Sequence, residues 1–124
     1  MKPTEHEIQS AFISWCEFPP TLRAFPELEM IFAIPNGANK SIATAMKFKR
    51  EGLRSGVPDV CLPVPIGKFH GLYLEFKRDH KQKLSPNQIE WAGKLERYGY
   101  KVRTVSDALT AEDIVKKYLR GEST

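Results

Sequence analysis

Three charged residues stand at the ends of two short β-type runs in the middle of the chain: Asp59, Glu75 and Lys77. The second run, residues 71–77, alternates between apolar and polar side chains, as a strand with one buried face does. Glu75 and Lys77 then point the same way, about 7 Å apart at a rise of roughly 3.4 Å per residue. Asp59 joins them if the first run, residues 56–62, pairs with the second. Two carboxylates beside an ammonium group are suited to bind a hard divalent cation and to polarise a phosphate.

These residues need a framework that holds the two runs side by side. Pro65-Ile66-Gly67 lies between the runs and is a turn signal, so a β-hairpin is predicted. Helices are predicted from Thr4 to the Pro19-Pro20 pair, over 41–52, over 85–98 and from Ser106 to about residue 118. Two further strands are predicted, one over 29–34 and one over 100–105, and the first is followed by a turn at Pro35-Asn36-Gly37. This order predicts an α/β fold in which helices flank a mixed β-sheet.

Length and composition favour a single domain. A chain of 124 residues can build one core without disulfides. Cys16 and Cys61 lie in apolar segments and are interpreted as reduced, buried thiols. No apolar run is long enough to span a bilayer and no signal peptide follows Met1, which predicts a cytoplasmic protein without a membrane partner. The net charge of +4 and the pI of about 9.1 suit a nucleic-acid partner.

Two polar residues lie where a helix begins and also border an apolar stripe. Thr4 and Glu7, like Ser85 and Gln88, have the spacing of a capping box. The predicted stripes are Ile8, Ala11, Phe12 and Trp15 in the first helix and Trp91, Ala92, Leu95 and Tyr98 in the third. Glu7 and Gln88 each either cap their helix or reach toward the charged trio. The pattern leaves both interpretations open, and one glutamate could serve both purposes.

Basic side chains concentrate on both sides of the trio. They are Lys40, Lys47, Lys49, Arg50 and Arg54 before it, and Arg78, Lys81 and Lys83 after it. A solvated surface helix accounts for such charge in many proteins. Here Arg54 leads directly into Gly56-Val57-Pro58-Asp59, and we therefore interpret these residues as contacts to DNA phosphates.

The spacing of these motifs resembles a known superfamily. Pro58-Asp59, followed sixteen positions later by Glu75-Phe76-Lys77, is similar to the signature of the PD-(D/E)xK nucleases. The wider set resembles the VRR-NUC family: an early helix with Glu7, Ile34-Pro35-Asn36, Gly56-x-Pro58-Asp59, Glu75-Phe76-Lys77, and Leu84-Ser85-x-x-Gln88 with Trp91 and Gly99-Tyr100. The resemblance covers about residues 7–119. It implies one nuclease domain over residues 1–124 with a restriction-endonuclease-like fold.

The resemblance implies a role for each motif residue. Asp59 and Glu75 match the metal-binding carboxylates, and Lys77 matches the catalytic lysine. Glu7 matches the first-helix glutamate that completes the acidic site, in direct contact with the metal or through water. Gln88 matches the glutamine at the start of the helix after the lysine strand.

A cofactor and a substrate follow from the same resemblance. Mg²⁺ or Mn²⁺ is expected on the two carboxylates and on the backbone carbonyl of Phe76. Stand-alone members resemble phage or bacterial proteins that act as homodimers on branched DNA. The expected function is therefore a homodimeric endonuclease of four-way (Holliday) junctions in DNA repair, in a bacterial cell or a phage-infected host. Phe18, Phe25, Leu28 and Phe69 belong to no predicted stripe and are candidates for the dimer interface.

Other interpretations stay open. The protein could nick or restrict ordinary duplex DNA, or it could bind DNA without cutting it. The complete set of Glu7, Asp59, Glu75 and Lys77 argues against a non-catalytic module, because a decayed site is expected to lose at least one of them. A surface ion pair between Glu75 and Lys77 is disfavoured, because the opposite face of that strand is too apolar for a two-stranded ribbon in water.

Overall fold

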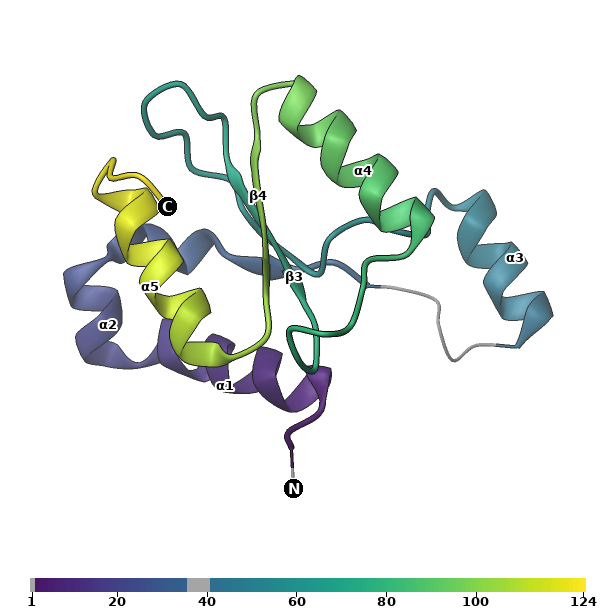
Figure 1. Ribbon diagram of the computed structural model, residues 1–124, viewed down its shortest axis with the longest axis horizontal. Helices are drawn as coiled ribbons and strands as arrows, with labels where there is room; N and C mark the ends of the chain where they lie inside the picture. The colour runs from purple at the N-terminus through teal and green to yellow at the C-terminus, as the bar shows by residue number, and fades with distance from the viewer. Residues whose placement is uncertain (1, 36–40) are drawn as a thin grey trace.

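The computed structural model describes residues 2–35 and 41–124, and its centre is a four-stranded mixed sheet (Figure 1). In spatial order the strands are β1 (Phe32–Ala33), β2 (Val60–Leu62), β3 (Leu72–Phe76) and β4 (Lys101–Val105). β2 pairs antiparallel with both β1 and β3, and Val60 lies opposite Leu74. β4 runs parallel to β3, so the chain must cross over between them, and a helix makes that connection. The predicted hairpin and mixed sheet are thus confirmed.

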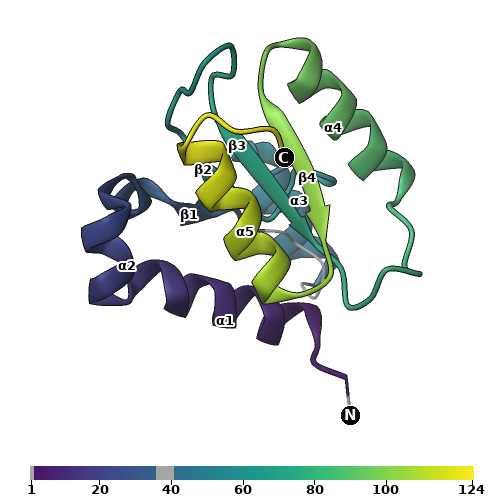
Figure 2. The same ribbon diagram turned by 60° about the vertical axis from the view of Figure 1, so that its left-hand side comes forward.

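Helices cover both faces of this sheet. They are α1 (Glu5–Glu17), α2 (Pro19–Ala24), α3 (Ile42–Arg50), α4 (Pro86–Arg97) and α5 (Ala108–Leu119), with a 3₁₀ helix, η1 (Pro26–Met30), after α2. Figures 1 and 2 show α1 and α5 on one face and α4 on the other, while α3 stands away from the sheet near the start of α4. Within the described residues, no helix is both long and apolar enough to cross a membrane.

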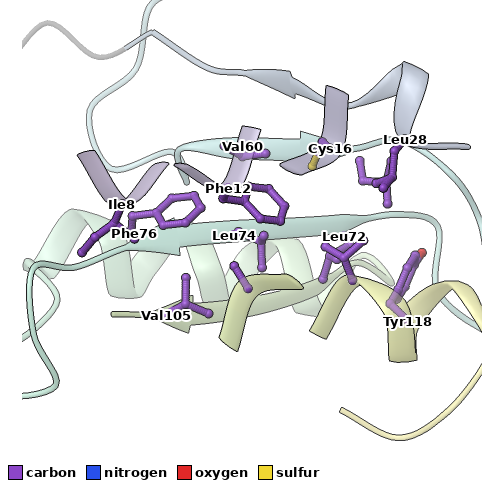
Figure 3. Packing of buried hydrophobic residues seen from close by; sticks show 13 residues of the cluster. Ile8, Phe12, Cys16, Leu28, Val60, Leu72, Leu74, Phe76, Val105 and Tyr118 are labelled. Carbon is purple, nitrogen blue, oxygen red and sulfur yellow. The ribbon is translucent and has the colours of Figure 1, made fainter. Parts of the chain in front are cut away.

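The core lies between the sheet and the layer formed by α1 and α5. Figure 3 shows Phe12 of α1 beside Phe76 of β3, and their ring centroids are 5.7 Å apart. The buried cluster also contains Ile8 and Cys16 from α1, Leu28, Val60 and Leu62, Leu72 and Leu74 from β3, Val105, and Ala111, Val115 and Tyr118 from α5. Burying a side chain of this kind contributes about 1.5–3 kcal/mol. This layer therefore holds the amino-terminal end of α1 against the end of β3.

The predicted strand over 29–34 is mostly wrong. Residues 26–30 form η1, and only Phe32 and Ala33 pair with β2. Pro26 has a fixed φ and no N–H group, so it favours the first position of a helix over a place in a strand. Both residues of β1 are exposed on the edge of the sheet. The predicted turn at Pro35-Asn36-Gly37 falls largely outside the described residues.

Three helix details also differ from the prediction. Ala11 is exposed, because the buried face of α1 runs through Ile8, Phe12 and Cys16 at intervals of four residues. Tyr98 is exposed at the end of α4. Asp107, not Ser106, caps α5, and its side chain accepts a hydrogen bond from the backbone N–H of Thr110.

The four apolar residues assigned to no stripe do not form one exposed surface. Leu28 is only 2% exposed and belongs to the core. Phe25 and Phe69 are partly buried against that core, and Phe18 alone is strongly exposed. Sequence spacing missed these contacts because the residues lie in turns and in η1, where neither helical nor strand periodicity applies. Cys16 and Cys61 are free and buried, as predicted.

Candidate active site

Asp59 is fixed from three directions at the start of β2. Its backbone N–H donates to the carbonyl of Leu74 at 3.0 Å, and its carbonyl accepts from the N–H of Ile34 at 2.7 Å. Its side-chain Oδ2 accepts a hydrogen bond from the backbone N–H of Phe76 at 2.7 Å. The hairpin therefore sets both the position of this residue and the direction of its carboxylate.

Glu75 lies on the face of β3 that points away from the α1–α5 core, and only 4% of it is exposed. Burial raises its pKa to about 9, and the hydrogen bond with Asp59 and the charge of Asp59 act in the same direction. The positive charge of Lys77 opposes this rise. Two carboxyl groups thus share a small, poorly solvated space, which favours a cation between them.

Lys77 follows β3 and is 5% exposed. Its Nζ donates a hydrogen bond to Oε1 of Gln88 at 2.8 Å. The same oxygen accepts from the backbone N–H of Ser85 at 2.8 Å and so completes the capping box of α4. Both interpretations of Gln88 are therefore true at once. No ion pair joins Glu75 to Lys77 within 4.0 Å in the described part of the chain.

Glu5, and not the predicted Glu7, is the acid that α1 turns toward its buried face. Glu7 is exposed, and its Oε1 accepts from the backbone N–H of Thr4 at 3.1 Å, which closes the capping box of α1. Glu5 is half-buried, and its negative charge helps to raise the pKa of Glu75. The sequence contained the signal: Glu5 lies three residues before Ile8 and seven before Phe12, and so shares their face of the helix. Glu7 instead shares the exposed side of the helix with Ala11.

A cavity of about 460 Å³ opens beside Asp59 and Gln88. Lys49 of α3 also lines it, as do Leu53 and Arg54, which follow that helix. Gly56 lies in its wall with a φ of +92°, and a Cβ at this position would come within 2.5 Å of the backbone carbon of Asn87. This close approach explains why glycine precedes the Pro-Asp pair.

Comparison with known proteins agrees with this geometry. The family model of the VRR-NUC domain matches residues 2–106. The chain belongs to the VRR-NUC family. It is also similar to a solved VRR_NUC domain protein, with 26% sequence identity and a TM-score of 0.81, over 100% of this chain and 98% of that one. No curated protein matches the chain.

Family membership makes this chain a nuclease domain and nucleic acid its expected substrate. The residues predicted to contact DNA phosphates are all exposed where the structure describes them: Lys47, Lys49, Arg50, Arg54, Arg78, Lys81 and Lys83. Lys40 lies outside the described residues. Arg54 donates to the backbone carbonyls of Lys49 and Leu53 at 3.1 and 3.3 Å, which holds its side chain against the end of α3. These charges are therefore available to a polyanion.

The donor set of the VRR-NUC domain fits a hard divalent cation. Among residues 2–35 and 41–124, no group of three His, Cys, Asp or Glu side chains is gathered closely enough to hold a metal by itself. Asp59 and Glu75 offer oxygen ligands, and the carbonyl of Phe76 directly follows Glu75 in sequence. Mg²⁺ and Mn²⁺ accept such sets, with the remaining positions taken by water and substrate oxygens.

Proposed function

We propose that this protein is a Mg²⁺- or Mn²⁺-dependent DNA endonuclease that hydrolyses phosphodiester bonds, with Asp59, Glu75 and Lys77 at its reaction centre. The observation that supports this most strongly is the pairing of the buried Glu75 with the half-buried Asp59, while Lys77, two residues after Glu75, is held by Gln88. A pair of like-charged carboxyl groups in a poorly solvated site is costly for folding alone. It becomes favourable when a cation neutralises it.

In this proposal Asp59, Glu75 and the carbonyl of Phe76 hold the metal. Glu5 takes the role that the sequence assigned to Glu7, that of the first-helix acid that completes the site. It does so because it lies on the inward face of α1. A divalent cation bound here supplies two things: it lowers the pKa of a water ligand and screens the charge of the phosphate.

Lys77 acts on the reacting phosphate in this proposal. Because Gln88 accepts one of its three N–H bonds, the ammonium is fixed, and two donors remain for the attacking water or a phosphate oxygen. A donor fixed in advance stabilises developing negative charge without reorganising during the reaction. Gln88 is a positioning residue for this ammonium.

The substrate we propose is branched DNA, in particular a four-way junction, bound by a homodimer. One reaction centre cuts one strand, and a junction is resolved by two symmetric cuts. Two copies related by a two-fold axis match the symmetry of such a substrate. Exposed apolar side chains on the edge strand and on α3, namely Phe32, Ile42 and Met46, are the candidates for contact between copies.

The experiment compares end-labelled four-way junctions with linear duplexes of the same sequence, each incubated with Mg²⁺, Mn²⁺ or EDTA. We expect cleavage only with a metal ion, and faster cleavage of the junction. Asp59→Asn is the control, and it should abolish cutting without changing the far-ultraviolet circular dichroism spectrum. If that variant still cuts DNA at the normal rate with a metal ion, Asp59 does not belong to the reaction centre and the proposed site is wrong.

Two results would redirect the substrate proposal. Equal rates on junction and linear duplex would favour a nicking or restriction-like nuclease. A single monomeric species in sedimentation at micromolar concentration would contradict the homodimer. Binding of DNA with no cutting in any metal ion would leave a non-catalytic DNA-binding module.

A further inference from the structure

Positive charge also gathers at the other end of the sheet, where β4 begins. Lys101 is the first residue of β4 and is only 8% exposed. Its Nζ lies 4.7 Å from the centroid of the Phe69 ring, and Nζ of Lys68 lies 5.4 Å from the same centroid. Two ammonium groups therefore share one aromatic ring.

Among the residues that the structure describes, these charges have no acidic partner in an ion pair. Burial lowers the pKa of Lys101, and the nearby positive charges of Arg103 and Lys68 lower it further. Within the described residues, none of the three forms an ion pair within 4.0 Å. Contact with a ring offsets part of the cost of a buried ammonium, but a nearby anion offsets far more.

A cavity of about 360 Å³ opens onto the two lysines. The hairpin loop supplies Lys68 and Phe69, β4 supplies Lys101, and the segment after α5 supplies Gly121 and Ser123. Glu122 also lines it without pairing with either lysine. Figures 1 and 2 show the loop and the end of α5 at the same end of the sheet. Its volume is in the range of small-ligand sites, about 300–1,000 Å³.

We propose that this cavity binds a phosphate group, held by the ammonium groups of Lys101 and Lys68. Two ammonium groups near one ring can donate to separate oxygens of one phosphate, and lysine serves as a point charge in such sites. The bound anion replaces the missing counter-charge of Lys101. The phosphate belongs either to the DNA backbone or to a free phosphate ligand such as a nucleotide.

This site is separate from the reaction centre. Lys101 pairs with Leu72, five residues before Lys77, which places the backbones of the two lysines about 17 Å apart at roughly 3.3 Å per residue. Leu72 faces the α1–α5 core, whereas Lys77 follows the alternation of Glu75 on the opposite face of the sheet. The proposal therefore does not rest on the catalytic assignment.

The first test measures binding of inorganic phosphate by thermal unfolding and by amide NMR, in EDTA and at constant ionic strength. Phosphate should raise the Tm of the wild type, because a ligand that binds only the folded state stabilises it. It should also shift the amide signals of Lys68, Phe69 and Gly121. Lys116→Met is the matched control, since Lys116 also lies over a ring, that of Trp15, but outside this cavity. It should respond as the wild type does.

Lys101→Met should weaken phosphate binding by about tenfold or more, as loss of a charged hydrogen bond does. Lys68→Met removes the second ammonium from an exposed position that is safe for folding, and it should weaken binding as well. If both variants respond to phosphate as the wild type does, the proposal is wrong. It is also wrong if the shifted amides lie only around Asp59 and Lys77.

The second test identifies the source of the phosphate. DNA affinity is measured against salt in the non-cutting Asp59→Asn background, with and without Lys101→Met. A fall of about 1 in the salt slope assigns the cavity to a DNA phosphate. An unchanged slope, together with a lost response to free phosphate, assigns it to a separate phosphate ligand. If Lys101→Met changes neither the salt slope nor the response to free phosphate, the proposed site is wrong.

Discussion

Lys77 Nζ and Gln88 Oε1 lie 2.8 Å apart, and the same amide oxygen accepts the backbone N–H of Ser85. One atom thus closes the cap of α4 and fixes the ammonium at the end of β3. A change to the Gln88 side chain should therefore affect both the cap of α4 and the proposed reaction centre.

Gln88→Glu separates these two duties of the side chain. Glutamate also completes a capping box, so stability should be kept. Its negative charge, however, forms an ion pair with Lys77 and draws the ammonium from the phosphate. We expect single-turnover cleavage to fall about 10–100-fold, as it does when a supporting contact is altered. Ser85→Ala is the control, and it should cost about 1 kcal/mol of stability with little effect on the rate. Cleavage at the normal rate by Gln88→Glu would contradict the positioning role.

Lys77→Met keeps most of the buried side-chain volume and removes the charge. If Lys77 acts on the transition state, the cleavage rate should fall by about 10²–10³. Equilibrium binding of DNA, measured in EDTA, should change far less. A variant that binds poorly but cuts normally once saturated with DNA would show Lys77 to be a binding residue.

Glu5 and Glu7 make a matched pair on one helix. Glu5→Gln should raise the Mg²⁺ concentration needed for half-maximal cutting, because it removes a negative charge close to Glu75. Glu7→Gln should have almost no effect, since glutamine also completes the capping box of α1. The measurement is the cleavage rate across a Mg²⁺ titration. A larger effect from Glu7→Gln would restore the assignment made from sequence.

Gly56→Ala should damage both stability and activity. The added Cβ would meet the backbone of Asn87, and the φ of +92° is strained for any L side chain. We expect a loss of about 1–3 kcal/mol together with slower cutting. Gly93→Ala is the control, because nothing lies within 4 Å of its added Cβ and alanine favours a helix by about 1 kcal/mol. Equal Tm values for the two variants would contradict the proposed constraint.

The basic residues of α3 should contribute to affinity without regard to base sequence. Replacing Lys47, Lys49 and Arg50 together by alanine should reduce the salt slope of DNA binding by about 3, close to 1 for each phosphate contact. Lys117→Ala on α5 is the control, and its slope should stay unchanged. Identical slopes for the wild type and the triple variant would refute the assignment.

The sequence by itself determined the features that depend on near neighbours. Thr4 with Glu7 and Ser85 with Gln88 form the predicted capping boxes, because the bonded atoms are only three residues apart. The hairpin brings Asp59 to Glu75 because its register follows from the alternation of a single strand. These local patterns were therefore enough to predict the residues of the proposed reaction centre.

Tertiary packing decided which side of each element faces inward. The rotation of α1 about its axis follows from the contact of Phe12 with Phe76, and that rotation turns Glu5, rather than Glu7, toward the site. The burial of Lys101 depends on the loop between β2 and β3 and on the segment after α5, which both lie against the start of β4. Spacing alone places Glu5 on the face of Ile8 and Phe12, but it does not show what that face packs against, and it gives no sign that Lys101 is buried. Contacts between residues far apart in sequence are formed only when the helices dock on the sheet.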